Sequence, residues 1–110
     1  MVSSVSFGGT TLTKLTSFQQ GNVTAELWYL TAPAVGSSSV SVSMAGGTSY
    51  GIAGATSWTG VDQTVPFGTP VSLGGNSGTP AVTVTSAPGE VVQDVLVWYR
   101  DVSYAPSATI

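Results

Sequence analysis

Alternation of apolar and polar side chains, with a repeat of two residues, is the dominant pattern along this chain. It is clearest from Val23 to Leu30, where Val, Ala, Leu and Tyr occupy one set of positions and Thr, Glu and Trp the other. A period of two places alternate side chains on opposite faces of a β-strand. The segment Ser39 to Met44 repeats the pattern, with Val40, Val42 and Met44 separated by serines. Both segments are therefore predicted to be strands with one buried face.

Glycine, proline and asparagine interrupt this pattern at intervals of about 8 to 12 residues, which is the spacing of strands in an all-β sandwich. The other predicted strands are Val2–Phe7, Leu12–Leu15, Tyr50–Thr59, Val71–Leu73, Ala81–Thr85 and Glu90–Tyr99. Gly8-Gly9 predicts a tight turn, Phe18–Asn22 a polar loop, and Pro88-Gly89 the two central positions of a type II turn. We expect an all-β fold, a single antiparallel β-sandwich domain over residues 1–110, Ig-like or jelly-roll, with about seven or eight strands.

Two features of the predicted strands concern burial. The side chains expected to form the core are Ala25, Leu27, Val40, Val42, Met44, Val82 and Val84. The last strand is apolar on both faces, whereas a sandwich strand normally has one polar face. We therefore expect a homo-oligomer that forms through the segment Val91 to Tyr104, with Trp98 and Tyr99 as anchors.

Charged side chains are scarce. The 110 residues include only two basic and five acidic ones, for a net charge of −3 at pH 7, while Ser and Thr number 16 and 15. Nucleic acids and anionic membranes need a basic surface, so neither is expected as a partner. No apolar run reaches the ~20 residues of a membrane span, so no membrane insertion is expected, and the N-terminus lacks the pattern of a signal peptide.

The residue types needed for catalysis are also scarce. The chain has no His and no Cys, so its many hydroxyl groups lack an imidazole base, and we expect no enzyme activity and no cofactor. Asp62, followed by Gln63 and Thr64, offers oxygen atoms to Ca²⁺, but Ca²⁺ needs about six to eight ligands and further carboxylates are missing nearby. We therefore expect no metal site, and we interpret Asp62 as the cap of an Asx-turn.

A covalent crosslink is a further alternative. Lys14, Glu26 and Asp94 fall on three different predicted strands and are the residue types that form an amide crosslink in some bacterial surface sandwiches. The simpler interpretation is that Lys14 faces solvent, because lysine is rarely buried.

Aromatic side chains supply the candidate binding site. Trp28 belongs to the predicted polar face of its strand with Thr24 and Glu26, and Trp58, Trp98 and Tyr99 could join it in a platform for sugar rings. The competing interpretation is that these rings cover the ends of the sheet or an interface. A glycan is therefore an alternative partner, and Trp28, Trp58, Trp98 and Tyr99 are the candidate binding residues.

Several segments resemble a widespread but poorly characterised β-sandwich module. They are Glu26–Leu30 followed by Ala32-Pro33, Ala53–Thr64, the loop Gly74–Thr79, and Val82–Val95 with Pro-Gly-Glu at its turn. Modules of this kind occur in large bacterial surface or secreted proteins and in environmental sequences. The resemblance spans residues 2 to 97, and members usually carry further strands on both sides. It implies an Ig-like or jelly-roll fold and an extracellular or cell-surface location, and it supplies no active site.

These observations predict a non-enzymatic structural or interaction module of an extracellular or surface protein. The alternative is a carbohydrate-binding module that uses exposed aromatic side chains.

Overall fold

The computed structural model describes residues 2–21, 23–46, 51–75 and 78–97. These residues form five β-strands and no helix, and the strands pair in antiparallel sheets. The predicted all-β class is thus confirmed. In the same residues, no helix has the length and apolar character needed to cross a membrane.

The chain is divided into two compact units. Unit 1 comprises Met1–Leu15 and Trp28–Pro66, and unit 2 comprises Thr16–Leu27 and Phe67–Ile110. Each is described below by itself.

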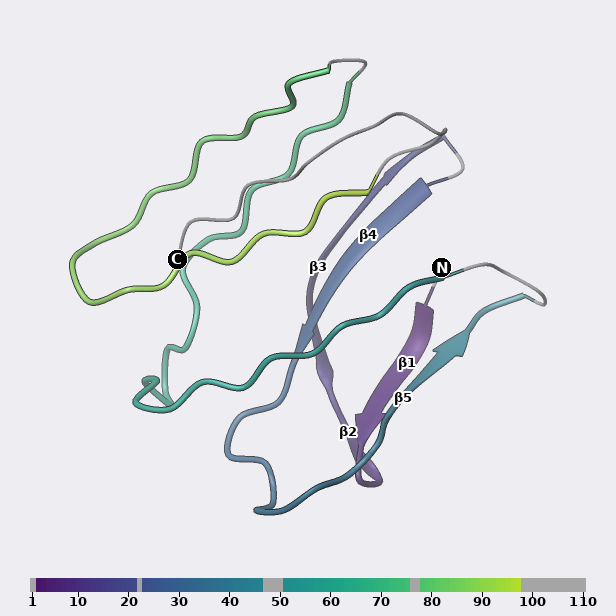
Figure 1. Ribbon diagram of the computed structural model, residues 1–110, viewed down its shortest axis with the longest axis vertical. Coiled ribbons are helices and arrows are strands. Elements are labelled where there is room, and N and C mark those ends of the chain that lie inside the picture. Colours follow the sequence, from purple (N-terminus) through teal and green to yellow (C-terminus); the bar gives the residue numbers. More distant parts are fainter. Residues whose placement is uncertain (1, 22, 47–50, 76–77, 98–110) are drawn as a thin grey trace. The chain divides into compact units, whose positions relative to one another are not determined.

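A three-stranded sheet lies in unit 1. It consists of β1 (Val2–Phe7), β2 (Thr10–Thr11) and β5 (Val40–Met44) in the order β2-β1-β5, as Figure 1 shows. The chain reverses between β1 and β2 through Gly8 and Gly9, whose φ angles are 56° and 87°. These values lie in the left-handed region that glycine adopts without steric cost, so the predicted tight turn is confirmed.

The register of the sheet sorts its side chains by polarity. Val5 lies opposite Val42 and Phe7 opposite Val40, whereas Ser6 lies opposite Ser41. Because alternate residues point to opposite faces of a strand, the apolar side chains share one face and the serines the other. The Ser3 hydroxyl also donates a hydrogen bond of 3.0 Å to the carbonyl of Ser43.

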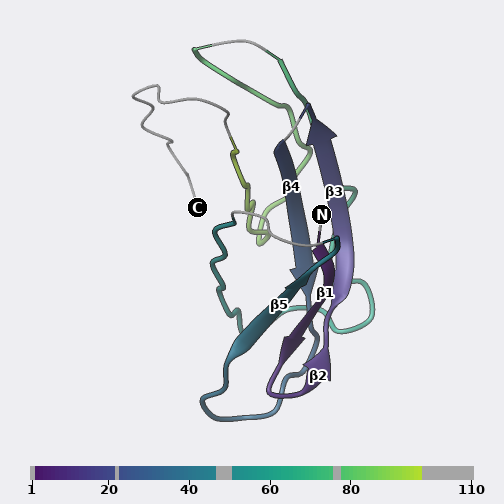
Figure 2. The ribbon, with the colours of Figure 1, turned by 90° about the vertical axis from the view of Figure 1, so that its right-hand side faces the viewer.

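A two-stranded sheet is formed by β3 (Thr13–Gln20) and β4 (Val23–Tyr29), both visible in Figure 2. The position of β4 is as predicted from its alternation. The predicted loop Phe18–Asn22 is wrong over Phe18–Gln20, which belong to β3; Gly21 lies in the turn that follows, and Asn22 lies outside the described residues. Gly21, at a φ of 59°, allows a reversal with only two residues between the strands, and the Gln19 side-chain amide donates 3.3 Å to the Gly21 carbonyl.

The described residues contain five strands, where seven or eight were predicted for the chain. The described residues of Tyr50–Thr59, Val71–Leu73, Ala81–Thr85 and Glu90–Tyr99 are not in strands. A strand needs a neighbour that accepts and donates its backbone hydrogen bonds. Alternation assigns side chains to faces but does not supply that neighbour.

The predicted core is also corrected by the structure. Among the described residues, the buried apolar side chain is Val5, at 6% exposure. Leu27 and Ala25 are half-buried, as is every residue of β4. The other predicted core residues are exposed: Val40 by 42%, Val42 by 40%, Met44 by 37%, Val82 by 49% and Val84 by 39%. In β5 the alternation correctly identified which face is apolar. An apolar face is buried, however, only where another layer covers it.

Candidate functional site: a hydroxyl-lined groove

A groove of about 410 Å³ lies in unit 2, within the range of small-molecule sites. Its lining combines hydroxyl groups, one carboxylate and small apolar groups, contributed by Gly68, Thr69, Val71, Thr83, Thr85, Ser86, Ala87 and Glu90. Two segments of the chain therefore form its walls, residues 68–71 and residues 83–90.

The second wall ends in a tight turn that the sequence predicts well. The Glu90 amide donates a hydrogen bond of 3.1 Å to the Ala87 carbonyl, and Gly89 has a φ of 86°. Proline before a glycine of positive φ is the signature of a type II turn. The turn predicted at Pro88-Gly89 is thus present.

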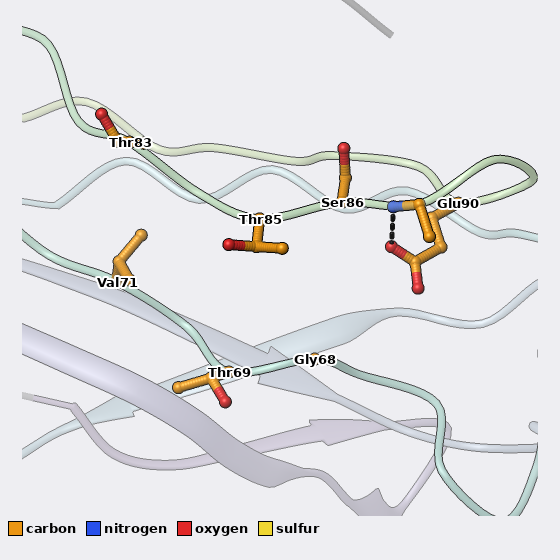
Figure 3. A pocket seen from close by; sticks show the side chains of 8 residues that line it. Gly68, Thr69, Val71, Thr83, Thr85, Ser86 and Glu90 are labelled. Carbon is orange, nitrogen blue, oxygen red and sulfur yellow. Dashed lines mark hydrogen bonds between the residues drawn. The ribbon is translucent and has the colours of Figure 1, made fainter.

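Glu90 closes the same turn a second time with its side chain. The Ala87 amide donates a hydrogen bond of 2.7 Å to the Glu90 carboxylate oxygen Oε2, shown as a dashed line in Figure 3. Together with the backbone bond in the opposite direction, this holds the carboxylate beside the turn. A carboxylate fixed in this way has further acceptor positions for a ligand.

The close-up view separates the side chains that enter the groove from those that do not. Thr85, Val71 and the Glu90 carboxylate extend into the space between the two walls, whereas the Ser86 hydroxyl points away from it (Figure 3). The groove thus offers a hydroxyl group, a carboxylate and an apolar side chain on its inner surface.

Hydrogen bonding is the chemistry that these groups support. A threonine hydroxyl both donates and accepts, and a carboxylate accepts. Unit 2 includes Glu26, Glu90 and Asp94 among its described residues and no Lys or Arg there, so an anionic ligand is disfavoured. The described lining therefore suits hydrogen bonding to a neutral polar group.

The aromatic residues predicted to bind a sugar lie elsewhere. Trp28 is on β4 and half-buried, and Trp58 follows in the irregular part of unit 1, with 45% of its surface exposed. The other two candidates, Trp98 and Tyr99, lie outside the described residues.

Trp28 has a cation over its ring. The Lys14 ammonium lies 5.5 Å from the centre of the indole, within the range of a cation–π contact. The indole N–H of Trp28 is buried and makes no hydrogen bond with the described residues. Because Lys14 covers one face of the ring, stacking of a sugar on that face would require the lysine to move.

Asp62 serves its own loop. Its carboxylate oxygen Oδ1 accepts hydrogen bonds from the amides of Thr64, at 2.8 Å, and Val65, at 3.2 Å. These two bonds, that of Thr64 first, lower the pKa of Asp62 below its usual value of 3.8. The Gln63 side-chain amide donates a hydrogen bond of 3.0 Å to the Val61 carbonyl. Asp62 is therefore the Asx-turn cap that the sequence predicts, and the described residues contain no cluster of three potential metal ligands.

The sequence interpretation did not select the groove residues as a site. The available signal was the alternation of Thr83 and Thr85 with Val82 and Val84, which places two hydroxyls on one face just before the Pro-Gly turn and Glu90. The opposite wall, residues 68–71, carries no comparable pattern.

Comparison of the chain with models of protein families, with curated proteins and with solved structures gave no match. The resemblance to the β-sandwich module thus stays a prediction from the sequence.

Proposed function

We propose that this chain is a non-enzymatic structural or interaction module of an extracellular or surface protein, built as an antiparallel β-sandwich. The exposure of its apolar side chains carries the proposal. On β5 the exposed residues are Val40, Val42 and Met44, and in residues 67–97 they are Phe67, Val71, Leu73, Val82, Val84, Val91, Val95 and Val97. Val40, Val42 and Met44 share one face of β5, and an exposed apolar face is typical of protein interfaces.

The residue inventory supports a role without catalysis. With no His and no Cys in the chain, the hydroxyl groups lack the base that nucleophilic catalysis uses. Asp62 has its pKa lowered and is engaged by its own loop. A catalytic acid or base at neutral pH needs the opposite displacement.

Contact with another protein is the proposed mode of action, and self-association is its simplest form. The segment Val91 to Tyr104 is the interface proposed from the sequence. In its described part, Val91, Val95 and Val97 are exposed by 51%, 48% and 41%, so these side chains are available to a partner.

Sedimentation of the purified chain at concentrations from about 1 to 500 μM tests this proposal, since specific dimers of modest interface area associate across this range. We expect the average mass to rise above 11.1 kDa as the concentration increases. A chain that remains monomeric throughout contradicts the proposed function.

The groove supports a second candidate function, carbohydrate binding. The polar groups of its lining that would contact a sugar are the Thr85 hydroxyl and the Glu90 carboxylate. A glycan array with the same chain separates the two candidates: saturable glycan binding by a monomer favours the second, and association without glycan binding favours the first.

A further inference from the structure

The outer edge of β5 presents backbone hydrogen-bonding groups. In the order β2-β1-β5, β5 is the last strand on its side of the sheet, and among the described residues its ladder partner is β1 (Figure 1). Opposite residues of an antiparallel pair alternate between exchanging hydrogen bonds and exchanging none. The hydrogen bonds of the sheet therefore show which backbone groups of β5 face outward.

Two bonds assign them. The Gly8 amide donates a hydrogen bond of 3.2 Å to the Ser39 carbonyl, so the backbone groups of Ser39 face β1. Those of Ser41 and Ser43, two and four positions later, face β1 as well. The Val5 carbonyl accepts a hydrogen bond of 2.8 Å from the Leu12 amide, on the side of β1 away from β5. This is expected if Val5 and Val42 exchange no hydrogen bond. The N–H and C=O groups of Val40, Val42 and Met44 thus point to the open edge.

The ladder of β5 with β1 shifts register between Val2 and Ser4, at the Met44 end, and β5 itself lacks two features that natural sheets use to block pairing with another chain. Such features are charged side chains, especially lysine, and proline within the edge strand. β5 reads Val-Ser-Val-Ser-Met, and the nearest charged residues in the sequence are Glu26 and Asp62.

The edge is also complementary to itself. If two β5 strands align antiparallel about a two-fold axis at Val42, Val42 meets its own copy and Val40 meets Met44 of the partner subunit. The residues that meet are those whose backbone groups point outward, so every outward N–H finds a carbonyl. The apolar face continues across the junction, and Ser41 lies opposite Ser43 of the partner subunit on the polar face.

We propose that β5 is the site at which two copies of the chain pair, by antiparallel strand addition about a two-fold axis at Val42. This inference rests on the proposed function as an interaction module. It identifies the partner as a second copy and places the contact at β5 in place of Val91 to Tyr104.

A charge-pattern experiment tests the register. Ser41→Lys with Ser43→Lys places lysines directly opposite each other at both ends of the junction, whereas Ser41→Lys with Ser43→Glu places a lysine opposite a glutamate. Both serines are exposed, and both variants change the same two positions. We expect the dimer Kd of the Lys/Lys variant to be about tenfold higher than that of the Lys/Glu variant.

Val95→Lys with Val97→Thr serves as the comparison at the other candidate interface. The β5 proposal predicts that this variant associates as the unmodified chain does. Loss of association here, together with equal dimer Kd values for the two β5 variants, would overturn the β5 proposal and leave the proposed function standing. A monomeric unmodified chain would contradict both.

Amide hydrogen exchange gives a second measurement that needs no substitution. Protection of the Val40, Val42 and Met44 amides should increase with protein concentration, because these amides point to the open edge. The amides of Ser41 and Ser43 should be equally protected at all concentrations, because they face β1. Concentration-independent exchange at Val42 in an associating chain would refute pairing at this edge.

Discussion

Val5 and Val42 lie opposite each other in β1 and β5, and their environments differ sharply. Val5, in the middle of the sheet, is 6% exposed, whereas Val42, in the edge strand, is 40% exposed. The two residues have the same side chain on the same face of one sheet. Their difference in burial therefore comes from position in the sheet and not from residue type.

Val5→Ala should lower the free energy of unfolding by about 2 kcal/mol, because it removes two buried methyl groups and leaves a cavity. Val35→Ala is the matched control, since Val35 is fully exposed, and it should change stability by less than about 0.5 kcal/mol. Chemical denaturation of the two variants provides the measurement. Equal effects would show that β1 is not central in the folded chain.

Asp62 should make the stability of the chain depend on acid. Its pKa is lowered in the folded state by the amides of Thr64 and Val65, so the stability it provides is complete above the unfolded pKa of 3.8. That contribution is lost as the pH falls through the lower, folded pKa. Unfolding midpoints from pH 7 to pH 2 measure it.

Asp62→Asn is the informative variant for this test. The asparagine keeps a side-chain oxygen for the two amides but cannot titrate, so the variant should be less sensitive to acid than the unmodified chain. Asp62→Ala should lower stability at pH 7, because both amides lose their acceptor. An identical acid profile for the unmodified and Asn forms would contradict this role for the carboxylate.

Adjacent glycines in the loop after residue 73 should respond differently to alanine. A Cβ atom on Gly74 would overlap the Gln20 side-chain oxygen and approach the Phe18 ring to 2.8 Å, whereas on Gly75 it would meet no atom within 4 Å. The Gln20 and Phe18 side chains are exposed and can shift, so Gly74→Ala should cost about 1 kcal/mol, and Gly75→Ala less than about 0.5 kcal/mol. Thermal unfolding compares them, and Gln20→Ala should recover part of the loss.

The groove gives a prediction for the second candidate function. Thr85→Val removes a hydroxyl that points into the groove and keeps the shape of the side chain, so it should weaken binding of a glycan by about tenfold. Ser86→Ala removes a hydroxyl that points away (Figure 3) and should leave binding unchanged. Titration calorimetry with a glycan selected on the array measures both. Equal affinities would exclude the groove as the binding site.

Local signals predicted local structure well. Alternation identified β4 and β5, the glycine pair identified the reversal after β1, and Pro88-Gly89 identified the turn beside the groove. Each of these depends on a few neighbouring residues and on their allowed backbone angles. The same holds for Asp62, whose hydrogen-bonding partners are two and three residues away.

Properties that require distant parts of the chain were predicted less well. Val82 and Val84 alternate with threonine as regularly as Val40 and Val42 alternate with serine, yet Val82 and Val84 are not in a strand. Both pairs are exposed, because alternation does not determine what covers a face. The groove was missed for a similar reason: residues 68–71 and 83–90 meet only in the folded chain.

The near absence of charge around β5 also determines which conditions can control its contacts. Unit 1 contains a single cation, Lys14, and a single anion, Asp62, and neither belongs to the edge strand. Dissolved salt weakens attractions between charges over distances of about 10 Å, and here there are almost none to weaken. The dimer Kd for association through this edge should therefore be similar at low and at high ionic strength. Cooling should loosen it, because apolar contacts lose strength as the temperature falls.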